Sequence, residues 1–156
     1  MPGNDDLPDF RHKRKVLFGE KTSREELREM GSRFMEHQRY DDALEFFQRA
    51  EAQDLVRQIV RRAIESGNTP LLMRAKKILE EDVAEEEWNE VGQAAEQAGL
   101  FSAAHLAHRQ AGHEGEAERL RRKMAEVQEL EAPTVEPVEE AHDGNGRGEH
   151  DAGLMH

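Results

Sequence analysis

Apolar side chains recur at helical spacing along most of the chain, and the first clear run follows Ser23. Leu27, Met30 and Phe34 lie three or four positions apart, which places them on one face of a helix. Glu26 stands three residues after Ser23, the Ser-x-x-Glu spacing with which a capping box closes a helix N-terminus. The pattern therefore predicts an amphipathic helix that begins directly after Ser23.

The same spacing predicts six more helices further along the chain. Their apolar faces lie within residues 43–50, 55–63, 72–79, 88–95, 101–110 and 120–127. We expect Asp41 and Thr69 to cap two of these helices, with Pro70 in the first turn that follows Thr69. Gly67, between a serine and an asparagine, is typical of a helix end. Val, Ile and Thr total only fourteen residues in the whole chain, which is poor material for a sheet, so the sequence predicts an all-α fold.

Two parts of this pattern match each other at an offset of 61 residues. The matched residues are Leu27, Met30, Gly31, Phe34, Tyr40, Ala43, Phe47 and Ala50 in the first part, and Trp88, Val91, Gly92, Ala95, Phe101, Ala104, His108 and Ala111 in the second. A glycine inside a helix costs about 1 kcal/mol relative to alanine. We therefore expect Gly31 and Gly92 where two helices approach closely, with Ala43 and Ala104 as their small partners.

The region between these two parts fits the same pattern more loosely. Aligning Gly67 with Gly99 and with Gln38 gives offsets of 32 and 29 residues. A period of about 30–34 residues in paired helices is typical of a solenoid.

These residues and spacings resemble the tetratricopeptide repeat family over about residues 25–112. The Tyr-Asp-Asp-Ala-Leu-Glu-Phe-Phe segment at 40–47 is close to that family's inter-helix signature, and Trp88 stands where the family favours tryptophan. The second unit departs from the pattern, with Val60 where the family has a small residue. The resemblance implies a right-handed alpha-alpha superhelix of three helical hairpins over residues 22–130, closed by a C-terminal capping helix at about 114–130. It also implies an adaptor that is not an enzyme.

In that family, the first helix of each unit turns a polar stripe toward a concave groove. Carried over to this chain, the stripe comprises Arg28, Ser32 and Met35, then Arg57, Arg61 and Ile64, and finally Asn89, Gln93 and Glu96. The three arginines would form a basic strip, and because guanidinium groups suit carboxylates, an acidic peptide is the ligand class that this implies. The alternative is that the arginines pair with neighbouring acids such as Glu25, Asp54 and Glu65.

The two ends of the chain differ in composition from its middle. Residues 1–21 contain two prolines and a basic cluster, and we expect an extended arm whose apolar end, Val16 to Phe18, covers the first hairpin. Residues 131–156 carry one basic and seven acidic side chains, a net charge of −6, with few large apolar residues. We expect this C-terminal tail to be disordered. Its charge also suggests that it folds back onto the basic strip.

Composition narrows the classes of function. With 22 basic and 34 acidic residues the net charge is −12, which disfavours binding to nucleic acids and to anionic membranes. The chain has no cysteine, no apolar run long enough to span a membrane and no secretory signal, so a cytoplasmic location is expected. No phosphate loop, calcium loop or nucleophile motif occurs, so no cofactor is expected. His105 and His108 have a spacing that permits chelation, but packing is the favoured interpretation and no metal is expected.

The sequence as a whole predicts a non-catalytic protein-interaction module, an adaptor or scaffold, that binds a peptide or a partner helix in its groove. The alternative is a structural subunit that self-associates or completes a larger assembly. Solution mass separates the two interpretations.

Overall fold

The fold is built from α-helices. The computed structural model describes residues 7–19 and 21–132, and within these ranges it contains eight α-helices and no strand. They are α1 (Phe10–Phe18), α2 (Arg24–Glu36), α3 (Tyr40–Arg49), α4 (Gln53–Ser66), α5 (Thr69–Ile78), α6 (Glu85–Gln97), α7 (Phe101–Gln110) and α8 (Glu114–Glu131). The all-α prediction is confirmed. None of the described helices has a stretch long and apolar enough to cross a membrane.

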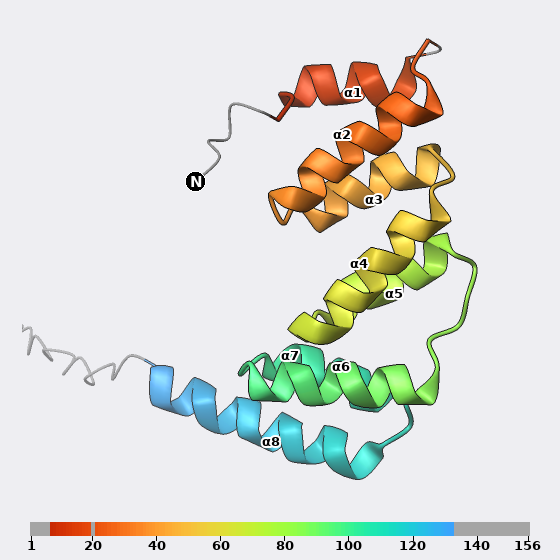
Figure 1. Ribbon diagram of the computed structural model, residues 1–156. Coiled ribbons are helices and arrows are strands. Elements are labelled where there is room, and N and C mark those ends of the chain that lie inside the picture. The colour runs from red at the N-terminus through yellow and green to blue at the C-terminus, as the bar shows by residue number, and fades with distance from the viewer. Residues whose placement is uncertain (1–6, 20, 133–156) are drawn as a thin grey trace, which may run out of the picture.

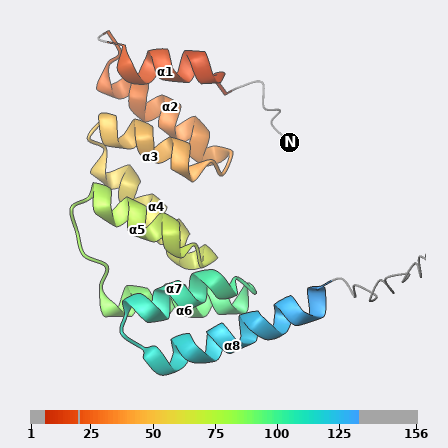
Figure 2. The ribbon, with the colours of Figure 1, turned by 180° about the vertical axis from the view of Figure 1, so that it is seen from behind.

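From α2 onward, neighbouring helices pack in pairs, and the pairs stack into an arc. Helix α2 packs on α3, α4 on α5 and α6 on α7, while α8 covers α7 at the C-terminal end. Contacts of α3 with α4 and of α4 with α6 join successive pairs. Figures 1 and 2 show the result from both sides, an arc that is hollow along one edge.

The turns between these helices share one backbone feature. Each of the six turns from α2 to α8 contains one residue with positive φ, between 54° and 77°: Gln38, Glu51, Gly67, Glu80, Gly99 and Gly112. The second helix of each pair has 10 residues. In each pair, the positive-φ residue in the turn before the second helix therefore lies 13 positions before the positive-φ residue in the turn after that helix. The three helix pairs thus share the position of the positive-φ residue relative to their second helix.

The buried core is uneven along the stack. Phe34, Phe46 and Phe47, from α2 and α3, are fully buried, and the rings of Phe34 and Phe46 stack with centroids 5.2 Å apart. At the other end, a separate small cluster contains Ala95, Ala104 and Leu120. The largest side chains therefore fill the N-terminal part of the stack, and α6 to α8 pack mainly through alanines.

The two helical glycines lie where helices approach closely, as predicted. A Cβ atom on Gly31 would lie 2.5 Å from a ring carbon of Phe47, and one on Gly92 would lie 3.0 Å from Nε2 of His108. The side chains nearest to the two glycines are the rings of Phe47 and His108, not the predicted partners Ala43 and Ala104. His108 is 7% exposed, which confirms that it packs in the interior.

The helix ends follow the predicted chemistry at some positions and depart from it at others. The Ser23–Glu26 capping box is present, and Gly67 ends α4 in the left-handed conformation. Asp41 was wrong as a cap, since it lies inside the first turn of α3, where its carboxylate accepts a hydrogen bond from Arg74 at 2.7 Å.

Thr69 is the second incorrect cap, and its actual contact joins two helix pairs. The cap of α5 is Asn68, whose side chain accepts a hydrogen bond from the Leu71 amide at 3.1 Å. Thr69 is fully buried, and its hydroxyl donates to the Ala103 carbonyl at 2.8 Å. A buried hydroxyl needs such a partner, so this bond ties α5 to α7.

The prediction of an extended N-terminal arm was wrong for residues 10–18, which form α1. Asp9 caps this helix, and Leu17 inserts into the core with 5% exposure, while Val16 packs against the same cluster. The expected docking of this segment on the first hairpin is thus confirmed for Val16 and Leu17, but Phe18 remains 64% exposed. The predicted tail lies outside the described residues from position 133 onward.

Candidate functional site

The nine residues predicted to line a groove lie on the first helix of each pair. Helix α2 carries Arg28, Ser32 and Met35, α4 carries Arg57, Arg61 and Ile64, and α6 carries Asn89, Gln93 and Glu96. Their side chains differ in environment. Met35 and Ile64 are partly buried against the core, and the Ser32 hydroxyl donates to the Arg28 carbonyl of its own helix at 2.9 Å. Arg61 and Gln93 are exposed.

Two of the predicted arginines form ion pairs with acids from the next part of the stack. Arg28 donates two hydrogen bonds to the Asp54 carboxylate, at 2.9 and 2.8 Å. These bonds, with the attraction between the charges, hold the pKa of Asp54 below its ordinary value. Arg57 pairs with Glu81 at 2.5 Å, and the hydrogen bond from Arg57 is the main cause of a lowered pKa at Glu81.

The same arrangement continues at the C-terminal end, where Arg119 of α8 pairs with Glu96 of α6 at 2.8 Å. Three of the nine predicted residues, Arg28, Arg57 and Glu96, therefore form ion pairs that link successive parts of the stack. The pairing alternative holds for Arg28 with Asp54, whereas Arg57 pairs with Glu81 and not with the acids expected from the sequence. Exposed ion pairs of this kind contribute little to stability, because water and salt screen the attraction between the charges.

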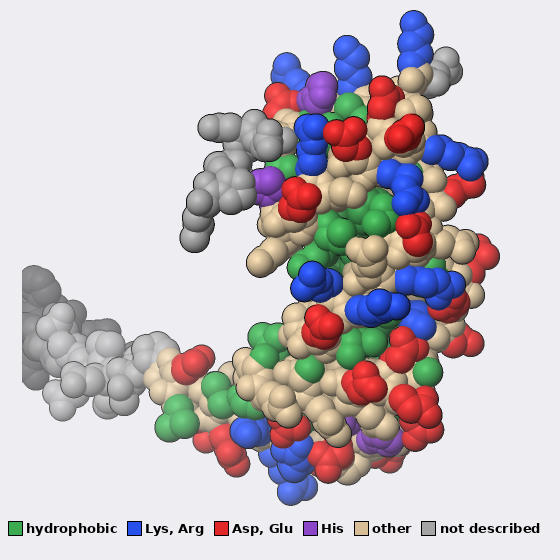
Figure 3. Space-filling model, viewed as in Figure 1, with side chains coloured by type: hydrophobic (Ala, Val, Ile, Leu, Met, Phe, Trp, Pro, Cys, Tyr) green, Lys and Arg blue, Asp and Glu red, His purple; other side chains and the backbone are tan. Residues whose placement is uncertain are grey.

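A groove that the sequence did not predict lies inside the hollow of the arc. It has a volume of about 870 Å³ and is lined by residues of the turns within all three helix pairs. The lining residues are Gln38 and Tyr40 from the first turn, Ser66, Gly67, Asn68 and Pro70 from the second, and Gly99, Leu100, Phe101, Ser102, Ala103 and Leu106 from the third turn and α7. Figure 3 shows the hollow that this edge of the stack borders.

The chemistry of this groove is mainly apolar. Leu100 is 46% exposed, and Phe101 and Leu106 are partly exposed beside it. Tyr40 and Pro70 bring an aromatic and an aliphatic ring from the other two turns. The ammonium group of Lys123 lies 4.7 Å from the centre of the Phe101 ring, although Lys123 itself does not line the groove.

None of the nine sequence-predicted residues lines this groove. The sequence did contain one signal for it. Tyr40 and Phe101 match each other in the two similar parts of the chain, each is the first residue of a helix, and a leucine precedes Phe101. An apolar residue directly after a turn is also compatible with burial, so this signal does not by itself predict a groove.

A comparison with protein-family models finds no match, and comparisons with curated proteins and with solved structures find none either. The functional argument therefore depends on the surfaces of the molecule itself.

His108 of α7 lies beside His113, the residue that precedes α8. The rings of His108 and His113 lie 5.9 Å apart, and Nδ1 of His108 is buried without a hydrogen-bond partner among the described residues. Burial lowers the pKa of His108 below its ordinary value. Within residues 7–19 and 21–132, no group of three or more histidine, aspartate or glutamate side chains is arranged to hold a metal ion.

Proposed function

We propose that this chain is a non-catalytic protein-interaction module whose hollow groove binds an apolar segment of a partner protein. The scaffold of this proposal is a right-handed, tetratricopeptide-like superhelix of three helix pairs closed by α8. Its support is the shared position of the positive-φ residue in the three pairs and the equivalent placement of Gly31 against Phe47 and of Gly92 against His108.

The observation that carries the proposal is the apolar lining of a concave surface. Soluble proteins rarely leave such patches uncovered unless they bind something. Leu100, Phe101 and Leu106 lie on one side of the groove, with Tyr40 and Pro70 facing it from the other turns. A short helix or an extended segment with two or three apolar side chains fits this lining.

The groove proposal does not depend on an acidic ligand. Arg28 and Arg57 already hold carboxylates from their own chain, so an acidic peptide on α2 or α4 would have to displace Asp54 or Glu81. Apolar contact inside the hollow is the better supported source of affinity. The cytoplasmic location expected from the sequence remains a prediction.

Selection from a displayed peptide library tests the groove. Peptides that bind the wild-type chain are expected to be rich in apolar residues, and Leu100→Glu is expected to weaken them about tenfold or more, because a carboxylate would enter an apolar contact. Leu130→Glu, at an exposed leucine outside the groove, and Arg57→Glu, on the predicted strip, are expected to leave affinity within about twofold. Peptides that respond to Arg57→Glu and not to Leu100→Glu would place the site on the helix row and overturn the groove proposal.

A structural subunit that self-associates is the second candidate function. The observation that favours it is the exposure of four large apolar side chains: Phe10 and Phe18 on α1, Leu100 before α7 and Leu130 on α8. Light scattering separates the two candidates. A concentration-independent mass of 17.9 kDa supports an interaction module, and a stable oligomer supports the subunit.

A further inference from the structure

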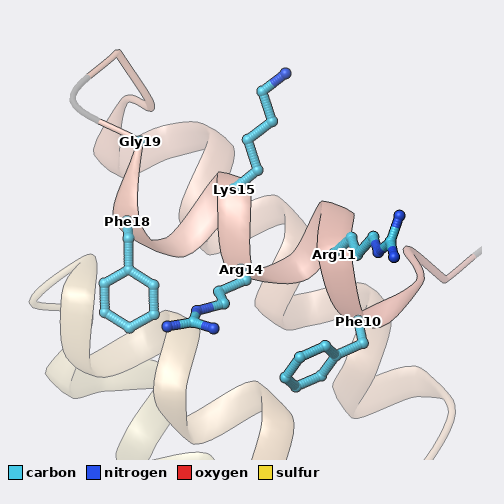
Figure 4. A pocket seen from close by; sticks show the side chains of 6 residues that line it. All are labelled: Phe10, Arg11, Arg14, Lys15, Phe18 and Gly19. Atoms are coloured by element: carbon cyan, nitrogen blue, oxygen red, sulfur yellow. The ribbon is translucent and has the colours of Figure 1, made fainter.

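Helix α1 exposes a face on which aromatic and basic side chains alternate. Phe10 is 76% exposed and Phe18 is 64% exposed. Arg14 lies between them in sequence, so the three side chains follow an i, i+4, i+8 pattern along one side of the helix. Figure 4 shows both phenylalanines on the same side of α1, with Arg14 extending between them and Lys15 pointing away. A depression of about 700 Å³ adjoins this face.

The orientation of α1 is set by contacts on its other side. Leu17 is buried against the first helix pair, and its carbonyl accepts a hydrogen bond from Arg49 at 2.9 Å. Lys13 pairs with Asp42 at 2.5 Å and with Glu45 at 3.1 Å. Burial alone would lower the pKa of Lys13, but the hydrogen bonds to Asp42 and Glu45 outweigh it and hold the pKa above its ordinary value. These contacts direct Phe10, Arg14 and Phe18 outward.

The charge of this helix is opposite to that of the whole chain. Helix α1 contains four lysines and arginines and no acid, whereas the chain carries a net charge of −12. Lys13 is paired, but Arg11, Arg14 and Lys15 form no ion pair with any residue in the described part of the chain. With respect to the described residues, these exposed cations therefore keep hydrogen-bonding groups available beside two exposed aromatic rings.

We propose that Phe10, Arg14 and Phe18, with Arg11 and Lys15 at the margin, form a docking face for an acidic amphipathic segment of a partner protein. A rise of about 1.5 Å per residue places the two phenylalanines roughly 12 Å apart along the axis. The fitting segment has two apolar side chains at that separation and carboxylates between and beside them. Arg14 pairs with the central carboxylate, and the rings supply apolar contact.

Charge complementarity favours a protein segment over a phosphate polymer or a membrane. Asp42 and Glu45 are held by Lys13 on the other side of α1, and the acidic remainder of the molecule repels an extended polyanion or an anionic bilayer. A short peptide makes contact with α1 alone and avoids that repulsion. This inference is independent of the groove, which lies at the turns of the three helix pairs.

The probe for this face is a fluorescein-labelled helical peptide of glutamate and alanine with two leucines eight positions apart, measured by anisotropy against the full chain. We expect binding that weakens as sodium chloride is raised, because exposed charges are screened. Arg14→Glu, and the double variant Phe10→Ala with Phe18→Ala, are each expected to weaken binding about tenfold or more. The matched variants Arg62→Glu and Leu130→Ala, at exposed residues on α4 and α8, are expected to stay within about twofold.

Circular dichroism of each variant tests whether the helices persist. Peptides with alanine for leucine or lysine for glutamate serve as ligand controls.

The proposal would be overturned if the matched variants lost as much peptide affinity as the α1 variants, or if the lysine peptide bound as tightly as the glutamate peptide. Binding that emerges only after removal of residues 133–156 would make the chain's own tail the occupant. Stronger α1-dependent binding of phosphatidylserine vesicles or single-stranded RNA would also overturn it. Leu100→Glu is expected to leave this binding unchanged, so failure here and failure of the groove remain distinguishable.

Discussion

At the scale of single residues, the turns depend on a backbone conformation that glycine adopts without steric cost. Gly67 and Gly99 both have this conformation, with φ of 70° and 74°, but their surroundings differ. A Cβ atom on Gly67 would lie 2.4 Å from the backbone of Ala95, whereas one on Gly99 would meet nothing within 4 Å. Gly67 therefore serves both a turn and a close contact between helix pairs.

We predict that Gly99→Ala lowers the free energy of unfolding by about 1 kcal/mol, the cost of a left-handed alanine. Gly67→Ala is expected to cost at least about twice as much, because the α6 backbone must also shift. Urea denaturation of the two variants measures the difference. Equal losses would mean that α4 and α6 are not held together at this contact.

His108 is the residue whose environment most directly links stability to pH. Burial is the main cause of its lowered pKa, with Glu116 and Glu96 opposing and His113 and Arg119 adding to the effect. In the unfolded chain the imidazole of His108 thus takes up a proton near pH 6.5, while in the folded chain it does so only at lower pH. Stability contributed by the neutral ring is complete above that range and is lost as the pH falls through it.

We predict that the wild-type chain loses stability between about pH 7 and pH 5 more steeply than His108→Phe does. Phenylalanine is the residue at the matched position 47, where its ring packs against Gly31, so the variant is expected to fold. Denaturant unfolding at several pH values gives both slopes. The variant His12→Gln, at an exposed histidine of α1, is the control and is expected to keep the wild-type slope.

At the scale of elements, the sequence predicted helices well where a local signal marks their ends. Ser23 with Glu26 and Gly67 are such signals, since capping depends on neighbours within four residues. Helix α1 was missed because Leu17 is its only buried side chain, so no apolar period marks it. The groove was missed because its walls come from three turns about thirty residues apart, and their meeting is a property of the stack.

The attachment of α1 to the rest of the stack rests on few contacts: buried Leu17, partly buried Val16, the hydrogen bond from Arg49 to the Leu17 carbonyl and the pairs made by Lys13. We predict that Leu17→Ala speeds hydrogen exchange of the α1 amides at least about tenfold, because losing a buried leucine costs about 2–5 kcal/mol. Amides of α4 are expected to keep their protection. Phe18→Ala, at an exposed ring on the same helix, is expected to change little.

At the scale of the whole molecule, packing strength decreases from the first helix pair to the last. The aromatic core of α2 and α3 removes more apolar surface from water than the alanine contacts of α6 to α8. In a stack where each unit contacts only its neighbours, stability follows these local differences.

We therefore predict that native-state hydrogen exchange is faster in α7 and α8 than in α3 and α4. Leu120→Ala is expected to widen the difference, because Leu120 is the only large side chain in the buried C-terminal cluster. Uniform protection across the four helices would show instead that the described stack opens as one cooperative unit.

The uneven core also has a consequence for biosynthesis. Nearly all of the main cluster comes from residues 17–79, so its members emerge from the ribosome before α6, α7 and α8 do. The nascent chain is then able to form a stable platform early, and the later helices add onto it one by one. The part of the chain that is translated first is thus also the part with the larger apolar core. Its large apolar side chains are therefore exposed to solvent only briefly during synthesis.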